Sequence, residues 1–375
     1  MRTAVISDLH LGSGGGVEML RRPEIRERLA EALDGVDRLV LLGDVLELRD
    51  RPLAEALERA APVLGAIGEI ASEAEVIIVA GNHDHHLIEP WLQERALDGA
   101  PPLALEQVGD ADSGVLGRVA NSLAPATGRF AYPGLWLRGD VYATHGHYLD
   151  RHLTIPTLER LGVAMVERLL GIEPGGPDPL EPPSGEDQVA KADEYERVQA
   201  PVYAFLFGLA QATVGERVGG ADPSLRIWRL LSGGTTRAAR MRSWLLGSVA
   251  LPGAIGVANR LGLGPVGADL SPGAIAKAGI AAMATVVERL EIDADHIIFG
   301  HTHRRGPLPS DPRWKVGSAS LWNTGSWVHT PALLGRTAAE SPYWPGTVAI
   351  VEDDGPPQLH HVLDDMSREE LAGVD

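Results

Sequence analysis

Acidic, amide and histidine side chains occur along this chain in short clusters of similar composition. Each cluster lies within one or two residues of an apolar run. The five clusters are Asp8-Leu9-His10, Gly43-Asp44-Val45-Leu46-Glu47, Gly81-Asn82-His83-Asp84, His145-Gly146-His147 and Gly300-His301-Thr302-His303. Carboxylate, amide and imidazole groups are the ligands that bind Mn, Fe, Zn and related divalent ions. Because the chain has no cysteine, the clusters indicate a metal site without thiolates.

The spacing within the clusters suits metal binding. His301 and His303 are two residues apart, as are Asp8 and His10, so on extended backbone both members of a pair point to the same side. Asp44 is the candidate to bridge two ions, because its carboxylate has two oxygens. Asn82 would ligate through a neutral amide oxygen without adding charge.

Charge counting favours an anionic phosphoester as the ligand of such a centre. Two divalent ions, the carboxylates of Asp8 and Asp44 and one hydroxide leave a net positive charge, to which neutral histidines and Asn82 add nothing. The ions would lower the pKa of bound water from about 15.7 toward 7 and so provide the hydroxide. Screening over about 8–10 Å keeps the charge of the whole chain from cancelling this local field.

The elements that position these clusters are expected to be strands. Apolar runs predict buried strands at 3–7, 38–42, 76–80, 140–144, 296–299, 321–323 and 347–351. Helical spacing predicts helices at 18–33 and 53–71, between the first three strands. This alternation predicts an α/β domain. Ligands bind such domains at the carboxyl ends of the strands, which is where the clusters lie.

The middle of the chain has a different character. Helical patterns at 158–170, 189–211 and 273–290 accompany a Pro/Gly-rich loop at 173–185. The simplest layout is a catalytic domain of residues 1–150 and 291–375, interrupted by a helical insertion or cap of residues 151–290. Residues 243–259 carry no charge but contain Pro252 and glycines. We expect a buried or interfacial helix pair there rather than a membrane span.

Taken in order, the clusters resemble the calcineurin-like metallophosphoesterases, whose pattern D-x-H, G-D-x-x-E, G-N-H-D, H-G-H and G-H-T-H is complete here. Asn323-Thr324-Gly325-Ser326 also looks like the family's Asn-x-Gly-Ser segment. The resemblance implies an α/β fold, a four-layer sandwich of two mixed β-sheets flanked by helices, to which the helical insertion is added. It also implies hydrolysis of a phosphodiester, phosphomonoester or pyrophosphate bond by in-line attack of a metal-bound hydroxide. The cofactors would be two divalent ions, with Mn favoured over Fe, Zn, Mg, Co or Ni.

The resemblance also implies roles for individual side chains. The ligands of one ion would be Asp8, His10, Asp44 and His303. The ligands of the other would be Asp44, Asn82, His145 and His301. His83 would act at the leaving-group oxygen, with Asp84 orienting it. His147 and Arg304, which follow ligands closely in sequence, are candidates for substrate contact, and Glu47 is a candidate hydrogen-bond acceptor for a histidine N–H.

Other interpretations stay open. Residues 7–12 and 300–304 resemble the UDP-2,3-diacylglucosamine pyrophosphohydrolases, although that family's G-N-R-D is G-N-H-D here and its H-G-D is H-G-H. A non-catalytic metal-binding scaffold is a second alternative, against which the complete ligand set argues. A nuclease would fit the metals, but 51 acidic against 33 basic residues, a net charge of −18, disfavour a nucleic-acid groove.

The predicted partner is therefore a phosphoester small molecule, with nucleic acid disfavoured. Peripheral membrane contact through the apolar insertion is retained as a hypothesis. The start of the chain contains no apolar stretch of signal-peptide type, which predicts a cytoplasmic protein. The sequence makes no prediction of the oligomeric state.

Overall fold

The computed structural model describes residues 1–13, 17–173, 191–212, 251–267, 269, 271–331 and 333–373. The chain divides into two compact units. The first comprises Met1–His147, Leu206–Gly220 and Ile292–Asp375, and the second comprises Tyr148–Phe205 and Ala221–Glu291. The sequence predicts a catalytic domain of residues 1–150 and 291–375 and an insertion of residues 151–290. These predicted boundaries are not decided by the division into units.

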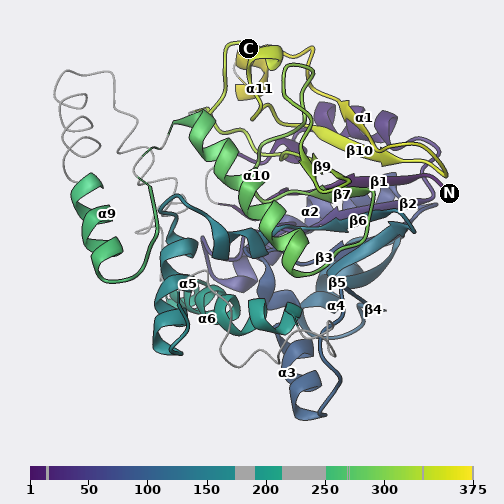
Figure 1. The fold of residues 1–375 in the computed structure, drawn as a ribbon. Helices are drawn as coiled ribbons and strands as arrows, with labels where there is room; N and C mark the ends of the chain where they lie inside the picture. The colour runs from purple at the N-terminus through teal and green to yellow at the C-terminus, as the bar shows by residue number, and fades with distance from the viewer. Residues whose placement is uncertain are drawn as a thin grey trace. The chain divides into compact units, whose positions relative to one another are not determined.

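The strands of the first unit form one mixed, hydrogen-bonded sheet (Figure 1). Their order is β11-β10-β1-β2-β3-β5-β6-β7-β9-β8, with β4 paired to β5 off this path. The strands are β1 (Thr3–Ile6), β2 (Arg38–Leu42), β3 (Glu75–Val79), β4 (Glu106–Asp110), β5 (Thr127–Arg138), β6 (Val141–Thr144), β7 (His296–Phe299), β8 (Lys315–Val316), β9 (Ala319–Asn323), β10 (Thr347–Val351) and β11 (Gln358–His361). β1, β2 and β3 are parallel, and so are β6, β7 and β9. Each parallel set brings its carboxyl ends to one edge.

The sheet folds back on itself through β5, its longest strand. The first half of β5 pairs with β3 and the second half with β6. Ser7, after β1, and Thr324, after β9, are six strand steps apart in the ladder, about 29 Å along a flat sheet. Their hydroxyl oxygens nevertheless lie 2.6 Å apart. The two halves of the sheet therefore face each other as a sandwich.

An apolar cluster fills this sandwich, with side chains from both halves. Among its members are Val5, Val40, Val79, Leu135, Val141, Ile298 and Ala349, each at most 1% exposed. Burying one such aliphatic side chain stabilises the fold by about 1.5–3 kcal/mol. The cluster holds the two sets of strand ends at fixed positions.

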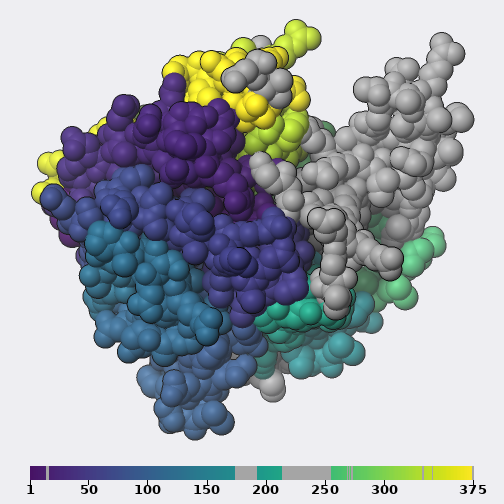
Figure 2. All heavy atoms as spheres, turned by 180° about the vertical axis from the view of Figure 1, so that it is seen from behind, coloured from purple at the N-terminus to yellow at the C-terminus, as the bar shows by residue number. Residues whose placement is uncertain are grey.

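Helices cover the face of the first half that points away from this cluster. They are α1 (Pro23–Ala32), α2 (Leu53–Ile70) and α4 (Gly114–Ser122). α1 contacts α2, and α2 contacts α4; α1 and α2 lie next to each other in the purple and blue surface of Figure 2. α1 begins with Pro23, whose fixed φ suits a first helical turn, and it buries Ile25 and Leu29, which are four residues apart.

The first unit also contains α3 (Glu89–Leu97) and α11 (Arg368–Ala372). The mixed α/β fold with flanking helices is thus as predicted. The predicted pair of separate sheets differs in one respect, because hydrogen bonding continues from one half to the other. The reason is that the twelve residues of β5 are long enough to belong to both halves.

The second unit is helical in its described residues. It contains α5 (Leu158–Leu169), α6 (Lys191–Ala212) as far as Phe205, α9 (Leu251–Arg260) and α10 (Pro272–Arg289). The side chains of Thr157 and Ser271 cap α5 and α10 by accepting hydrogen bonds from backbone N–H groups of the first turns. Of the predicted loop at 173–185 and the uncharged stretch at 243–259, residues 174–185 and 243–250 lie outside the described residues. No helix in the described part of the chain combines the length and apolar character needed to cross a membrane.

Candidate metal centre

The five sequence clusters follow strand ends and meet at one place in the first unit. Asp8 and His10 follow β1, Asp44 follows β2, Asn82 and His83 follow β3, His145 follows β6, and His301 and His303 follow β7. Their donor atoms form three overlapping groups, each within 4.8 Å: Asp8, His10 and His303; His10, Asp44 and His83; and Asp44, His145 and His301. Six of the seven residues predicted to be ligands are therefore neighbours. The seventh, Asn82, contacts His145 and His301 of the third group.

One side of the centre is formed by Asp8, His10 and His303. The Nε2 atoms of the two histidines are 3.1 Å apart, and His303 Nε2 is 3.3 Å from Asp8 Oδ1. Asp44 reaches this side as well, with its Oδ2 3.7 Å from His10 Nε2.

The other side is formed by Asn82, His145 and His301. The Oδ1 of Asn82 lies 3.0 Å from His301 Nδ1 and 3.3 Å from His145 Nε2. The same Oδ2 of Asp44 is 3.3 Å from His145 Nε2. Asp44 thus lies between the two sides, in the position expected of a bridging carboxylate.

The donor set fits divalent cations. Asn82 Oδ1 and Asp44 Oδ2 are both acceptors, yet they lie only 3.2 Å apart. A cation between them would turn this repulsive contact into a favourable one. Asp8 and Asp44 are buried, and among the described residues no lysine or arginine pairs with either carboxylate. Because a buried charge needs compensation, the geometry and the charge both call for bound cations.

The backbone at the ligand positions is unusual. In the described residues, six non-glycine residues have positive φ, and five of them are the predicted ligands Asp8, His10, Asp44, His301 and His303, with φ between 47° and 66°. Asp and His tolerate this left-handed region better than branched residues do. Such strain persists where the surrounding structure enforces it, and it accumulates at functional sites.

Two glycines of the motifs lie directly against ligand side chains. A Cβ on Gly43, which has a φ of 82°, would overlap the His145 ring, and a Cβ on Gly81 would overlap the Asp44 carboxylate. Both positions therefore require glycine because the backbone and a ligand approach closely.

Glu47 holds two histidine rings. Its Oε2 accepts hydrogen bonds from Nδ1 of His10 (3.0 Å) and from Nδ1 of His83 (2.8 Å). This contact leaves Nε2 of His10 directed at the centre. His145 is fixed in the same manner, because its Nδ1 donates to the carbonyl of Leu42 (2.9 Å). The structure agrees with the prediction that Glu47 accepts a hydrogen bond from a histidine N–H. It also shows that Glu47 contacts two histidines, His10 and His83.

The charges around His83 favour its protonated form. Burial opposes that form, but the negative charges of Glu47 and Asp44 outweigh it and raise the pKa of His83 to about 10. Burial also opposes the charged form of His145, whose pKa the charge of Asp44 raises to about 9.

Asp84 has a different position from the one implied by the resemblance. Its carboxylate accepts hydrogen bonds from the backbone N–H groups of Val45 (2.7 Å), Leu46 (3.2 Å) and Gly81 (2.6 Å). Among the described contacts none joins it to the ring of His83, which Glu47 orients instead. Asp84 therefore ties the loops after β2 and β3 together. Burial and the charge of Asp44 raise the pKa of Asp84 to about 6.

The two residues predicted to contact substrate occupy structured positions. His147 is buried, with its Nε2 3.2 Å from the hydroxyl of Tyr132 and its ring centre 5.6 Å from that of His145. Arg304 donates to Asp311 Oδ1 (2.8 Å) and lies over the ring of Trp314. Substrate contact stays a prediction for both, and Arg304 already has an ion pair within its own loop.

Arg49 is a residue at this centre that the sequence interpretation missed. Its side-chain Nη2 donates to the backbone carbonyl of Asn82 (2.6 Å), and its backbone N–H donates to Glu47 Oε1 (2.9 Å). The signal available in the sequence is its place two residues after Glu47, on the same loop.

Residues 323–327 form hydrogen bonds to the loops of the centre. Asn323 Nδ2 donates to the carbonyl of Gly300 (2.8 Å), and the N–H of Trp327 donates to the carbonyl of Asp8 (3.1 Å). The loop after β9 therefore fixes the loops that carry His301 and Asp8.

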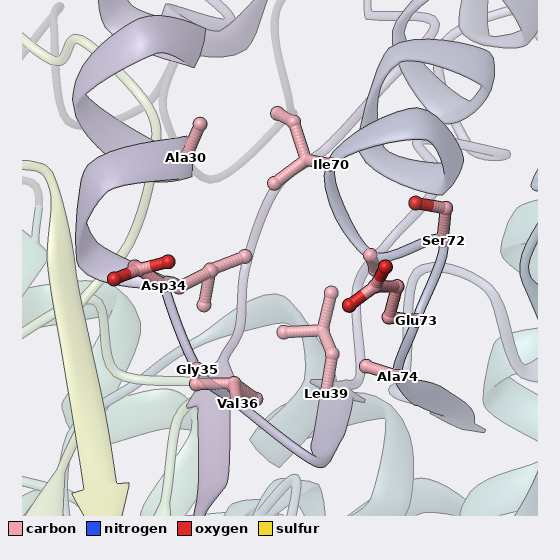
Figure 3. A pocket seen from close by; sticks show the side chains of 11 residues that line it. Ala30, Asp34, Gly35, Val36, Leu39, Ile70, Ser72, Glu73 and Ala74 are labelled. Atoms are coloured by element: carbon pink, nitrogen blue, oxygen red, sulfur yellow. The ribbon is translucent and has the colours of Figure 1, made fainter.

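A separate cavity of about 230 Å³ lies between the carboxyl ends of α1 and α2 (Figure 3). Leu39, near the start of β2, lines it, whereas Asp44 follows the end of that strand. The acidic side chains of Asp34 and Glu73 stand on opposite sides of this cavity in Figure 3. It belongs to the opposite edge of the sheet and is not part of the metal centre.

Comparison with known proteins gives a family match and similar solved structures. Residues 1–184 match the family model described as calcineurin-like phosphoesterase. Among solved structures, the chain is similar to a dimetal phosphatase from Danio rerio (14% identity, TM-score 0.33, covering 96% of this chain and 98% of the other). It is also similar to a cold-active protein-tyrosine phosphatase of a psychrophilic Shewanella (12% identity, TM-score 0.29, covering 94% and 75%). No curated protein matches the sequence.

Proposed function

Residues 1–184 belong to the calcineurin-like phosphoesterase family, and from this premise we propose that the protein is a two-metal phosphoesterase whose centre is the cluster at the strand ends. The observation that supports it best is the position of Asp44 between two groups of ligands. Asp8, His10, Asp44 and His303 would hold one ion, and Asp44, Asn82, His145 and His301 would hold the other. Mn is the favoured ion, with Fe, Zn, Mg, Co and Ni as alternatives.

When bound, the ions would supply a water of lowered pKa and neutralise the phosphoryl oxygens, which allows in-line attack on phosphorus. The chain's own residues prepare this reaction. Glu47 and Leu42 fix the tautomers of His10 and His145, so that Nε2 of each ring faces the ligand-binding side. The buried strand ends keep these rings in place, which avoids reorganisation during the reaction.

His83 is the proposed general acid. Its Nδ1–H is held by Glu47 and its backbone N–H donates to Asp44 Oδ1 (2.8 Å), so both its ring and its backbone are anchored to the centre. Because Nδ1 faces Glu47, Nε2 is the ring atom that would give a proton to the departing oxygen. Glu47 takes the orienting role that the sequence interpretation gave to Asp84.

Hydrolysis of a phosphodiester, a phosphomonoester or a pyrophosphate bond fits this arrangement, and UDP-2,3-diacylglucosamine-type pyrophosphohydrolysis stays an alternative. A non-catalytic metal-binding scaffold stays a second alternative, which the turnover measurements test. Peripheral membrane contact through the insertion and a cytoplasmic location stay predictions.

The proposal is tested by metal analysis of the purified protein, followed by turnover of phosphomonoesters, phosphodiesters, cyclic nucleotides and nucleotide-sugar pyrophosphates. We expect two ions per chain and activity that a chelator abolishes and added Mn restores. His145→Ala should lose at least one ion together with most activity, because the ring contributes one of few ligands on its side.

His360→Ala is the matched control, since His360 is exposed on β11, a strand that none of the predicted ligands follows. Its metal content and activity should equal those of the unmodified protein. Full turnover by the metal-free protein would contradict the proposed function.

A further inference from the structure

The two oxygens of the Asp8 carboxylate have different neighbours. Oδ1 lies 3.3 Å from Nε2 of His303, a member of the same group of ligands. Oδ2 accepts a hydrogen bond from the hydroxyl of Ser7, the residue before Asp8 in the chain. The backbone N–H of His301 is 3.1 Å from both oxygens. Asp8 therefore directs one oxygen at another ligand, while a serine binds the second.

A second hydroxyl lies behind that of Ser7. Oγ1 of Thr324 is 2.6 Å from Ser7 Oγ. Ser7 follows β1 and Thr324 follows β9, so the two hydroxyls come from opposite halves of the sheet. Asp8, Ser7 and Thr324 are each at most 1% exposed, which keeps bulk water from competing for their hydrogen bonds. These three side chains form a buried hydroxyl row that ends at the metal centre.

The direction of the hydrogen bonds in the hydroxyl row follows from the number of protons. An ionised carboxylate is only an acceptor, so the Ser7 hydroxyl donates to Asp8 Oδ2. Ser7 has one hydroxyl proton, so Thr324 is the donor in the contact at 2.6 Å. The carbonyl of Phe299, 3.2 Å from Thr324 Oγ1, already accepts from the backbone N–H of Thr324 (3.0 Å). Both hydroxyl protons therefore point toward Asp8, and each bond strengthens the next.

The hydroxyl row holds the carboxylate of Asp8 in one orientation. Rotation of the carboxylate would break the hydrogen bond between Oδ2 and Ser7 inside the protein, where a lost hydrogen bond is costly. Gly300 packs against the same atoms, because a Cβ at this position would overlap both Asp8 Oδ2 and Ser7 Oγ. Oδ1 is consequently the oxygen that faces His303 and the centre.

We propose that Ser7 is a positioning residue of the metal centre and that Thr324 acts through it. The hydroxyl of Ser7 binds Oδ2 of Asp8, which leaves Oδ1 for the ion of the group Asp8, His10 and His303. This inference rests on the proposed function and deepens it, because it assigns a role to two residues outside the set of ligands. Hydrogen-bond partners of metal ligands typically change metal affinity about 10–100-fold.

A purely structural role of the two hydroxyls would have a different signature. A contact that only joins the halves of the sheet would stabilise the metal-free fold and would affect both ions alike. A positioning contact acts on Asp8, which belongs to one of the two sides of the centre. Loss of the Ser7 hydroxyl should therefore weaken one ion more than the other, and Thr324 should contribute only while that hydroxyl is present.

The experiment measures Mn binding to the full-length protein after a chelator has removed its ions. Titration calorimetry gives the number of ions and their affinities, and urea unfolding gives the stability of the metal-free protein. The variants are Ser7→Ala, Thr324→Val, Thr324→Ser and the double variant Ser7→Ala/Thr324→Val. Thr347→Val is the matched control, because it removes an equally buried hydroxyl on β10, whose partner is Nδ1 of His361 (3.1 Å).

We expect Ser7→Ala to weaken one ion about 10–100-fold and the other less than about threefold. Thr324→Val should weaken the same ion about 3–10-fold, because it removes the donor behind Ser7 but leaves Ser7 in place. Thr324→Ser keeps the hydroxyl and should keep the affinity of the unmodified protein. The double variant should bind like Ser7→Ala, since Thr324 acts through Ser7.

Three results would each overturn the inference: unchanged affinity in Ser7→Ala, equal weakening of both ions, or additive effects of the two changes. A similar loss of affinity in Thr347→Val would also overturn it, because that hydroxyl is not in the row. If urea unfolding shows that Ser7→Ala does not fold, the comparison of Thr324→Val with Thr324→Ser decides. Equal Mn affinities of these two variants would then contradict the inference.

Turnover of phosphoesters separates this inference from the proposed function. If the unmodified protein binds two ions but hydrolyses no phosphoester, the proposed function fails, and the affinities of the variants still decide the inference. If Ser7→Ala binds Mn as the unmodified protein does and turnover is normal, the inference fails and the proposed function stands. Binding of fewer than two ions by the unmodified protein would overturn both.

Discussion

Each unit of the molecule buries a group of charged side chains, but the two groups are compensated differently. In the second unit, Arg151 Nε donates to Glu167 Oε1 (2.8 Å), and Arg160 Nη1 lies 3.8 Å from Glu167 Oε2. All three residues are at most 2% exposed. In the first unit, the buried carboxylates of Asp8 and Asp44 face histidine nitrogens and the oxygen of Asn82.

This difference distinguishes structural charges from functional ones. The counter-charges of Glu167 are arginines of the same unit, so this buried carboxylate needs no cation from outside the protein. Among the described residues, the neighbours of Asp44 are histidines, the oxygen of Asn82 and one backbone N–H rather than an arginine or lysine, which is the environment of a metal ligand. Burial of a carboxylate alone therefore does not indicate a site, and the chemistry of the atoms facing it decides the question.

The largest effect is expected when the shared carboxylate is neutralised. Asp44→Asn should lower kcat/KM about 10³-fold or more and remove at least one ion, because both ligand groups use this side chain. Without metal, the variant should be at least as stable as the unmodified protein, since a buried charge has been removed. Turnover, metal content and thermal unfolding measure these effects. Asp98→Asn, at an exposed position after α3, is the control and should change none of them.

The corresponding change in the second unit should affect stability without changing metal content. Glu167→Gln leaves Arg151 and Arg160 without their shared carboxylate and should destabilise the second unit by about 3–5 kcal/mol. Urea unfolding, with hydrogen exchange of the α5 amides, measures the loss. Glu288→Gln, at an exposed position of α10, is the matched control. A loss below about 1 kcal/mol for Glu167→Gln would show that the internal pairs do not stabilise this unit.

Metal removal should weaken the first unit alone. At an ion concentration 100 times the dissociation constant, binding stabilises the folded state by about 2.7 kcal/mol. Because His145 has a raised pKa of about 9 in the metal-free protein, binding must release its proton, and affinity should increase as the pH rises from 6 to 8. Calorimetry in buffers of different ionisation enthalpy measures the proton release. Binding that does not depend on pH in this range would contradict this assignment.

The smallest effect concerns a histidine of the second unit. Burial and the charges of neighbouring arginines lower the pKa of His152 to about 3. The unfolded chain takes up this proton near pH 6.5 while the folded chain does not, so stability decreases as the pH falls from about 6.5 toward 3, by at most about 1.4 kcal/mol per pH unit. His152→Gln should flatten this dependence, as judged from urea midpoints at pH 5 and pH 7. An unchanged slope would show that His152 does not contribute to it.

Strands with uninterrupted apolar runs were predictable from the sequence. β2, β7 and β10 have the bounds expected from their Val, Ile and Leu content. β5 was not predicted, because Gly128, Pro133 and Gly134 interrupt it. The structure accommodates Pro133 where the pairing with β4 is irregular. The strand that links the two halves of the sandwich was therefore missed because glycine and proline obscure its strand pattern.

The meeting of the clusters could be predicted because every cluster follows a strand. The contacts among their side chains could not, since they depend on ring orientation and loop conformation. Glu47 serves two histidines rather than one, and Asp84 bonds to backbone rather than to His83. Arg49 was missed because an arginine on a loop has no distinguishing pattern until its neighbours in space are known.

The fold-back at β5 has a consequence for synthesis of the protein on the ribosome. Asp8 is made before His303, which follows it by 295 residues. Until that late segment emerges and the second half of the sheet closes over the first, a growing polypeptide carries an incomplete set of ligands. High-affinity binding of two ions therefore indicates that the whole catalytic unit has folded. Fragments that end before residue 300 should not bind two ions in this way.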